Sequence, residues 1–190
     1  MMNTDQVLYR LKSGNERFVS DKLDGKLQNS SRRGELTSGQ EPYAIVLSCA
    51  DSRVVPELAF DTGLGEIFVV RVAGNIANTS SIASIEYAVA HIGSPVIVVL
   101  GHESCGAVTA AVKGGDNGYN LNHLVSHIQP AIAASADGAS VNEVVKENAR
   151  RTANDLQERS SIIRKAVQDG KVKIVPAYYN LDSGKVDILG

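Results

Sequence analysis

Residues 43–57 read YAIVLSCADSRVVPE, and this stretch governs the expected fold. Its first five residues are apolar without alternation, which is typical of a strand buried on both faces of a parallel sheet. Cys49, Asp51 and Arg53 follow directly. In open α/β sheets, ligands lie beyond the carboxyl ends of the strands. The stretch therefore predicts a central strand that ends in a functional loop carrying a thiol, a carboxylate and a guanidinium.

Three more apolar runs resemble the first and predict further buried strands, at 66–72, 95–100 and 172–177. Apolar residues at helical spacing lie before and between these runs, and they predict helices at 4–18, 79–92, 121–134 and about 140–169. The final stretch, YYNLDSGKVDIL, predicts a strand, a Ser-Gly turn and a short antiparallel strand. Strands that alternate with helices predict an α/β fold with a mostly parallel central sheet flanked by helices.

Local signals mark the ends of the helices. Thr4 is a candidate N-cap of the first helix, and Ser140 with Glu143 forms a capping-box signature that opens the last one. Gly93 is expected to end the second helix. Residues 19–42 are polar and turn-rich, so they predict an arm or loop without a strong element of its own.

The composition predicts one globular domain, 1–190, in which residues 1–42 supply the N-terminal helix and arm. A hydrophobic fraction of 43% and a net charge of −2 are ordinary for such a domain. No Lys/Arg block is longer than a pair, which argues against a nucleic-acid or anionic-membrane partner. No apolar run approaches the ~20 residues of a membrane span. The first residues show no secretory signal pattern, so the cytoplasm is the expected location.

The two cysteines, Cys49 and Cys105, are too few for a disulfide scaffold. Cys105 ends the stretch GHESC, which follows a predicted strand and also contains His102. Two thiolates and one imidazole suit Zn²⁺, and three protein ligands leave the fourth tetrahedral position open, as in catalytic zinc sites. The residues therefore predict a zinc site. Two buried inert thiols, or a structural zinc with Asp51 as the fourth ligand, stay open as alternatives.

Other motifs do not support a competing site. GHESCG lacks the Lys-Ser/Thr pair of a phosphate-binding loop. His123 and His127 are four residues apart but project opposite to the apolar stripe of their helix, which predicts a solvated face. His91 has no partner in the sequence and is predicted to be structural.

The pair CADSR and GHESCG resembles the β-class carbonic anhydrases, whose pattern is C-x-D-x-R followed by H-x-x-C. The stretches LKSGNERF, GEIFVVRVAGN, SIEYAV and YYNLDSGKV extend this resemblance over nearly the whole chain. The resemblance implies Zn²⁺ on Cys49, His102 and Cys105. It also implies that Asp51 and Arg53 act as a paired dyad beside the metal.

The resemblance further implies a substrate pocket and an oligomer. Gln40 falls at the position of a substrate-binding glutamine, Phe68 and Tyr87 at those of aromatic residues lining a narrow apolar pocket, and Gly106 at that of a backbone N–H that meets the substrate. In the family, the glutamine and the aromatic residues reach the site across a dimer interface, and the N-terminal helix wraps the partner. A homodimer or a dimer of dimers is therefore implied.

The activity implied is the reversible hydration of carbon dioxide to bicarbonate and a proton, by attack of zinc-bound hydroxide that the dyad orients. If Arg53 released Asp51, the carboxylate could take the fourth zinc position and close the site. Val46 stands where some relatives carry a regulatory tryptophan, and the chain has no tryptophan, so that regulation is not expected. The alternatives are hydrolysis of carbonyl sulfide or carbon disulfide on the same zinc core, or a non-catalytic zinc or redox module. No motif marks a proton shuttle among the tyrosines, His91, His123 and His127.

Overall fold

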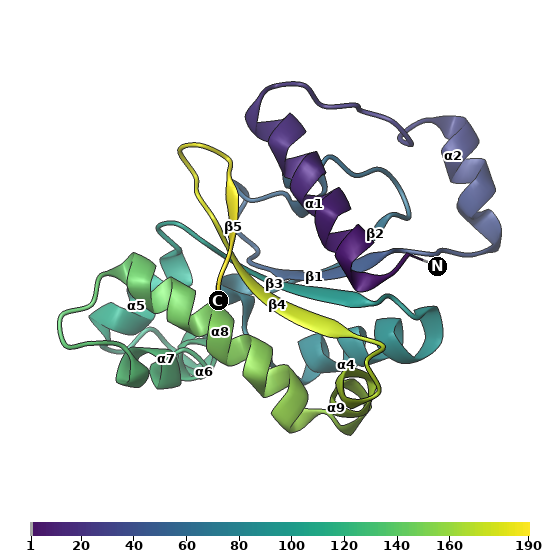
Figure 1. The fold of residues 1–190 in the computed structure, drawn as a ribbon. Coiled ribbons are helices and arrows are strands. Elements are labelled where there is room, and N and C mark those ends of the chain that lie inside the picture. Colours follow the sequence, from purple (N-terminus) through teal and green to yellow (C-terminus); the bar gives the residue numbers. More distant parts are fainter. Residues whose placement is uncertain (1) are drawn as a thin grey trace.

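Five strands form one sheet in the order β2-β1-β3-β4-β5 (Figure 1). The computed structural model describes residues 2–190. Strands β1 to β4 run parallel, and β5 runs antiparallel to β4. The strands span Ala44–Ser48 (β1), Ile67–Arg71 (β2), Val96–His102 (β3), Lys173–Tyr179 (β4) and Val186–Ile188 (β5). The predicted α/β fold with an antiparallel C-terminal strand is confirmed.

Helices cover both faces of the sheet. In Figure 1, α1 lies on one face, and α4, α8 and α9 lie on the other. The α-helices span Thr4–Val19 (α1), Ser30–Glu35 (α2), Pro56–Ala59 (α3), Thr79–Tyr87 (α4), Gly106–Lys113 (α5), Tyr119–Ser126 (α6), Gln129–Ala134 (α7), Val141–Arg159 (α8) and Ser161–Gln168 (α9). Single turns of other helix types occur at Leu36–Ser38, Ala73–Asn75 and Ala88–Ile92. Within residues 2–190, no helix has both the length and the apolar character to cross a bilayer.

Strand β1 is apolar throughout because both of its faces are covered. Ile45 and Leu47 belong to a hydrophobic cluster that includes residues of α4, α8 and α9. Ala44 and Val46 point the other way, into a cluster that includes α1. All four side chains are fully buried. This two-sided burial explains why the run in the sequence does not alternate between apolar and polar residues.

Two predictions in the loop-rich regions are wrong. Residues 19–42 do contain a helix, α2, whose N-cap Asn29 accepts a hydrogen bond from the backbone N–H of Arg32. The helix predicted at 121–134 is two helices, α6 and α7. Pro130 lies in the first turn of α7, where a residue without an N–H is tolerated.

The long helix predicted at 140–169 is also two helices, because the helical conformation is interrupted at Ser160. The Ser160 hydroxyl accepts a hydrogen bond from the backbone N–H of Ile163 and thereby caps α9. The same hydroxyl donates to the carboxylate of Glu86 at 2.6 Å, which ties the break to α4. The helix predicted at 79–92 ends at Gly93 as expected, but its last part, Ala88–Ile92, is a π-helical turn.

The start of α1 differs by one residue from the prediction, because Asn3 rather than Thr4 is the N-cap. The middle of α1 packs unusually close to α3. A Cβ atom built on Gly14 would lie 1.9 Å from the carbonyl oxygen of Phe60, so only glycine fits there. The glycine in LKSGNERF therefore sets the distance between the N-terminal helix and the body of the protein.

Asn15, the next residue, fixes α1 to two distant segments. Its side-chain amide donates to the carbonyl oxygens of Ala59 and Gly184, each at 2.9 Å. Its side-chain oxygen accepts the backbone N–H of Val186, also at 2.9 Å. Asn15 is 5% exposed, so these three bonds replace water at a buried site.

We expect Asn15→Ala to lower the free energy of unfolding by about 3 kcal/mol, because three buried backbone groups lose their partner. Urea unfolding followed by circular dichroism measures this change. Asn120→Ala, which removes an exposed amide from α6, is the matched control and should change stability by less than about 0.5 kcal/mol. Equal effects of the two substitutions would contradict this role of Asn15.

Candidate metal centre and active site

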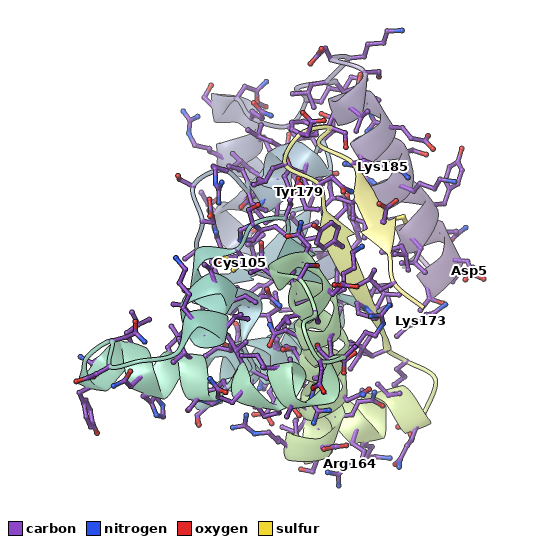
Figure 2. All side chains as sticks on the ribbon, turned by 90° about the vertical axis from the view of Figure 1, so that its left-hand side faces the viewer. Asp5, Cys105, Arg164, Lys173, Tyr179 and Lys185 are labelled. Atoms are coloured by element: carbon purple, nitrogen blue, oxygen red, sulfur yellow. The ribbon has the colours of Figure 1, made fainter. Side chains whose placement is uncertain are left out.

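Three metal-binding side chains from separate segments meet at the carboxyl end of the sheet. Cys49 follows β1, His102 ends β3, and Cys105 is the N-cap of α5. Because β1 and β3 are parallel neighbours, both of their carboxyl ends reach the same edge. One ligand atom from each of the three residues lies within 4.8 Å of the others, and all three residues are buried. Figure 2 shows Cys105 at the start of α5.

The His102 ring presents one free nitrogen to this cluster. Its Nδ1 lies 2.8 Å from the carbonyl oxygen of Glu103, so this nitrogen carries the proton and donates. The other nitrogen, Nε2, is therefore an acceptor with a free lone pair. It is buried and has no hydrogen-bond partner within residues 2–190. A buried lone pair without a partner is costly, and a metal ion would satisfy it.

The two sulfur atoms shift each other's pKa in opposite directions. A hydrogen bond from the Cys105 thiol lowers the pKa of Cys49 to about 4, with a further contribution from the backbone N–H of Gly74, which lies 3.4 Å from Cys49 Sγ. The same hydrogen bond, together with burial, raises the pKa of Cys105. The hydrogen bond thus favours a thiolate at Cys49 and a thiol at Cys105, and a divalent cation would displace the remaining proton to bind two thiolates. The donor set of two sulfurs and one imidazole fits zinc.

Asp51 and Arg53 form a two-pronged ion pair beside the cluster. Arg53 Nε donates to Asp51 Oδ1 at 3.0 Å, and Arg53 Nη2 donates to Asp51 Oδ2 at 2.8 Å. These bonds hold the pKa of Asp51 well below its usual range. Asp51 Oδ2 also lies 3.8 Å from His102 Nε2. The carboxylate thus faces the cluster while its two oxygens stay engaged with the guanidinium.

Gly106 directly follows Cys105, so it lies beside the cluster of Cys49, His102 and Cys105. Gln40, Phe68 and Tyr87 lie away from this cluster. Gly106 is exposed at the N-terminus of α5, and apart from its chain neighbours and the backbone of its own helix no atom lies within 4 Å of a Cβ built there. Phe68 pairs with Ile45 in register, so it lies about 13 Å along the sheet from Cys49.

Those three residues form a second group of their own. The rings of Phe68 and Tyr87 lie with centroids 6.4 Å apart. Tyr87 and Gln40 line one surface groove of about 690 Å³, which His91 also lines. None of Cys49, His102 and Cys105 lines this groove.

Comparisons with known proteins agree with this geometry. Residues 44–186 match the family model described as carbonic anhydrase. The chain is 40% identical to carbonic anhydrase 2 of Mycobacterium tuberculosis, over 97% of this chain and 93% of that protein. The chain belongs to the β-class carbonic anhydrase family.

Solved β-carbonic anhydrases have the same fold. The structure of the β-carbonic anhydrase CcaA aligns with a TM-score of 0.78 and 25% identity, covering 97% of this chain and 95% of that one. One of two β-carbonic anhydrases from Sordaria macrospora, described as tetrameric, aligns with a TM-score of 0.73 and 24% identity, covering 98% of both chains.

For a carbonic anhydrase of this class, sequence reasoning missed several residues that surround the site. Arg71 donates to the backbone oxygen of Cys49. Asn148 donates to the backbone oxygen of Gly74, whose N–H contacts the Cys49 sulfur. Their contacts join residues 17 to 74 positions apart, and no local spacing marks such pairs. Of the histidines, His123 is exposed as predicted, whereas His127 is half-buried, and burial lowers its pKa.

Proposed function

We propose that this carbonic anhydrase catalyses the zinc-dependent, reversible hydration of carbon dioxide to bicarbonate and a proton. The observation that carries the proposal is the buried Nε2 of His102, which has no partner among residues 2–190 and lies beside two thiols and an ion-paired carboxylate. Cys49, His102 and Cys105 would hold the ion. When bound, zinc acts as a Lewis acid that activates water near neutral pH.

Asp51 orients the attacking oxygen in this proposal. A carboxylate held ionised can only accept hydrogen bonds, so the hydrogen on the attacking oxygen must point to Asp51. A lone pair of that oxygen then points to the carbon of the substrate. Arg53 keeps Asp51 ionised and aimed through its two parallel bonds. The oxygen of water becomes the third oxygen of bicarbonate, and the released proton passes to buffer.

The substrate pocket is a proposal that needs a second copy of the chain. Gln40, Phe68 and Tyr87 group together, yet they lie away from the cluster of their own chain. In a two-fold symmetric dimer, each copy can supply these residues to the other copy's cluster. Gly106 would supply its N–H within the same chain. The tetrameric relative supports an oligomer, and the segment 1–42 would wrap the partner.

Subunit complementation tests this arrangement. Heterodimers of a Gln40→Ala chain and a Cys49→Ser chain, purified with two different tags, should show about half of the wild-type rate, because one of their two sites is complete. Each homodimer by itself should be much slower. CO₂ hydration of the three species is the measurement. A heterodimer no faster than the homodimers would place Gln40 in the site of its own chain.

The activity itself is tested by stopped-flow CO₂ hydration on protein of known zinc content, beside a sulfide-release assay with carbonyl sulfide. We expect a rate that scales with bound zinc and a preference for CO₂. Faster sulfide release than CO₂ hydration would identify a carbonyl sulfide hydrolase. Stoichiometric zinc without either activity would identify a non-catalytic module.

A further inference from the structure

Arg71 is an exposed residue that belongs neither to the three proposed zinc ligands nor to the Asp51–Arg53 pair. It also does not line the groove that contains Gln40. It is the last residue of β2, and it pairs in register with Ser48, the residue before Cys49. Its side chain therefore starts beside the point where the loop of residues 49–54 leaves the sheet.

The guanidinium of Arg71 bonds to three backbone carbonyls of that loop. Arg71 Nε donates to the oxygen of Cys49 at 2.9 Å. Arg71 Nη2 donates to the oxygens of Asp51 and Val54, at 2.6 Å and 2.8 Å. One planar group thus bridges the start, the middle and the end of the loop.

This bridging matters because the loop lies beyond the ladder of β1. The paired residues of β1 end at Ser48, so the sheet does not fix the residues that follow. The loop nevertheless carries a proposed zinc ligand, Cys49, and the proposed orienting carboxylate, Asp51. Arg71 holds the backbone at both of these residues.

The segment that follows Arg71 holds the sulfur atom of the same loop. The backbone N–H of Gly74 donates to Cys49 Sγ, and the carbonyl of Gly74 accepts from the Asn148 side chain at 2.9 Å. A side chain at position 74 would meet Ile128 at 2.9 Å, and its φ of 71° also favours glycine. The segment 71–74 therefore contacts both the backbone and the sulfur of Cys49.

We propose that Arg71 is a positioning residue, whose guanidinium sets the distance between Cys49 and Asp51 by clamping the carbonyls of the loop between them. The inference rests on the proposed function for its catalytic consequence, but its effect on metal binding does not depend on the reaction. Lysine cannot replace this arginine, because one ammonium nitrogen cannot span three separated carbonyls in a planar fork.

The test compares Arg71→Ala with a matched control, Arg164→Ala. Arg164 also donates to two backbone carbonyls, those of Gln157 and Glu158, but it lies on α9, well separated from Cys105 (Figure 2). Both substitutions remove an exposed guanidinium that bridges carbonyls. Only Arg71→Ala should weaken zinc binding, by about 10-fold in a chelator competition. Substitution of residues that hold metal ligands in place typically has an effect of this size.

At saturating zinc, Arg71→Ala should lower kcat by about 10-fold with little change in KM, because the substrate pocket is untouched. Added methylguanidinium should restore part of both losses, and the cobalt-substituted variant should show altered visible absorption bands. Arg71→Lys should resemble Arg71→Ala, and it serves as the second variant if the alanine protein does not fold. Size-exclusion chromatography should show the wild-type oligomer in each case.

Zinc affinity and kcat equal to those of Arg164→Ala would overturn the inference, as would full function of Arg71→Lys. Loss of activity that appears only together with loss of the oligomer would also overturn it. If the wild type bound zinc but hydrated no CO₂, the proposed function would fail. The role of Arg71 would then still be decided by zinc affinity and by the cobalt spectrum.

Discussion

Cys49→Ser should abolish stoichiometric zinc binding and reduce CO₂ hydration to the uncatalysed rate. The substitution removes one of the three proposed ligands and replaces a thiol with a hydroxyl, which does not ionise near neutral pH. The expected loss of zinc affinity exceeds the ~10–100-fold that changes to outer partners of ligands cause. Metal analysis after dialysis and stopped-flow CO₂ hydration measure the two effects.

Chelation of the wild type should have the same result and should be reversed by adding zinc, whereas added zinc should not rescue Cys49→Ser. Circular dichroism should show that the variant keeps its secondary structure, because Cys49 and Cys105 belong to a third hydrophobic cluster, and the two main clusters on the faces of the sheet do not include the three candidate ligands. A Cys49→Ser protein that kept its hydration rate would contradict the assignment and would favour a structural or redox role for the cysteines.

Asp51→Asn should keep stoichiometric zinc yet lower kcat by roughly 10²-fold or more, in the range that one positioned proton-handling group contributes. The amide cannot form the two charge-assisted bonds to Arg53, and its nitrogen can only donate where the carboxylate accepts. The three cluster residues are unchanged. Rate measurements on protein of known zinc content separate this catalytic loss from metal loss.

Asp169→Asn is the matched control for this charge removal. Asp169 pairs with Lys165 on the exposed surface of the last helix, and such pairs contribute little. Its substitution should leave kcat and zinc content unchanged. An Asp51→Asn enzyme with wild-type kcat would refute the orienting role of Asp51, whereas a variant without zinc would show that Asp51 maintains the metal site instead.

Local sequence determined the four parallel strands and the three candidate metal-binding residues, Cys49, His102 and Cys105. Each buried strand is a continuous apolar run, and this signal needs no knowledge of the neighbours. Cys49 and His102 could be assigned to one edge because parallel neighbouring strands end on the same side of a sheet. The break between α8 and α9 was less visible, because Ser160 caps α9 and also bonds to Glu86, which is distant in the sequence.

Only the tertiary structure decided which residues support and complete the site. It set the separation between Phe68 and the cluster of its own chain, since strand register sets distances that residue types do not encode. It also brought Arg71 onto three carbonyls of the loop after β1. Hydrogen bonds between a side chain and a distant backbone depend on how the chain packs. The sequence by itself therefore identified the reactive groups of this protein, and the packing of β1 against β2 decided how they are held.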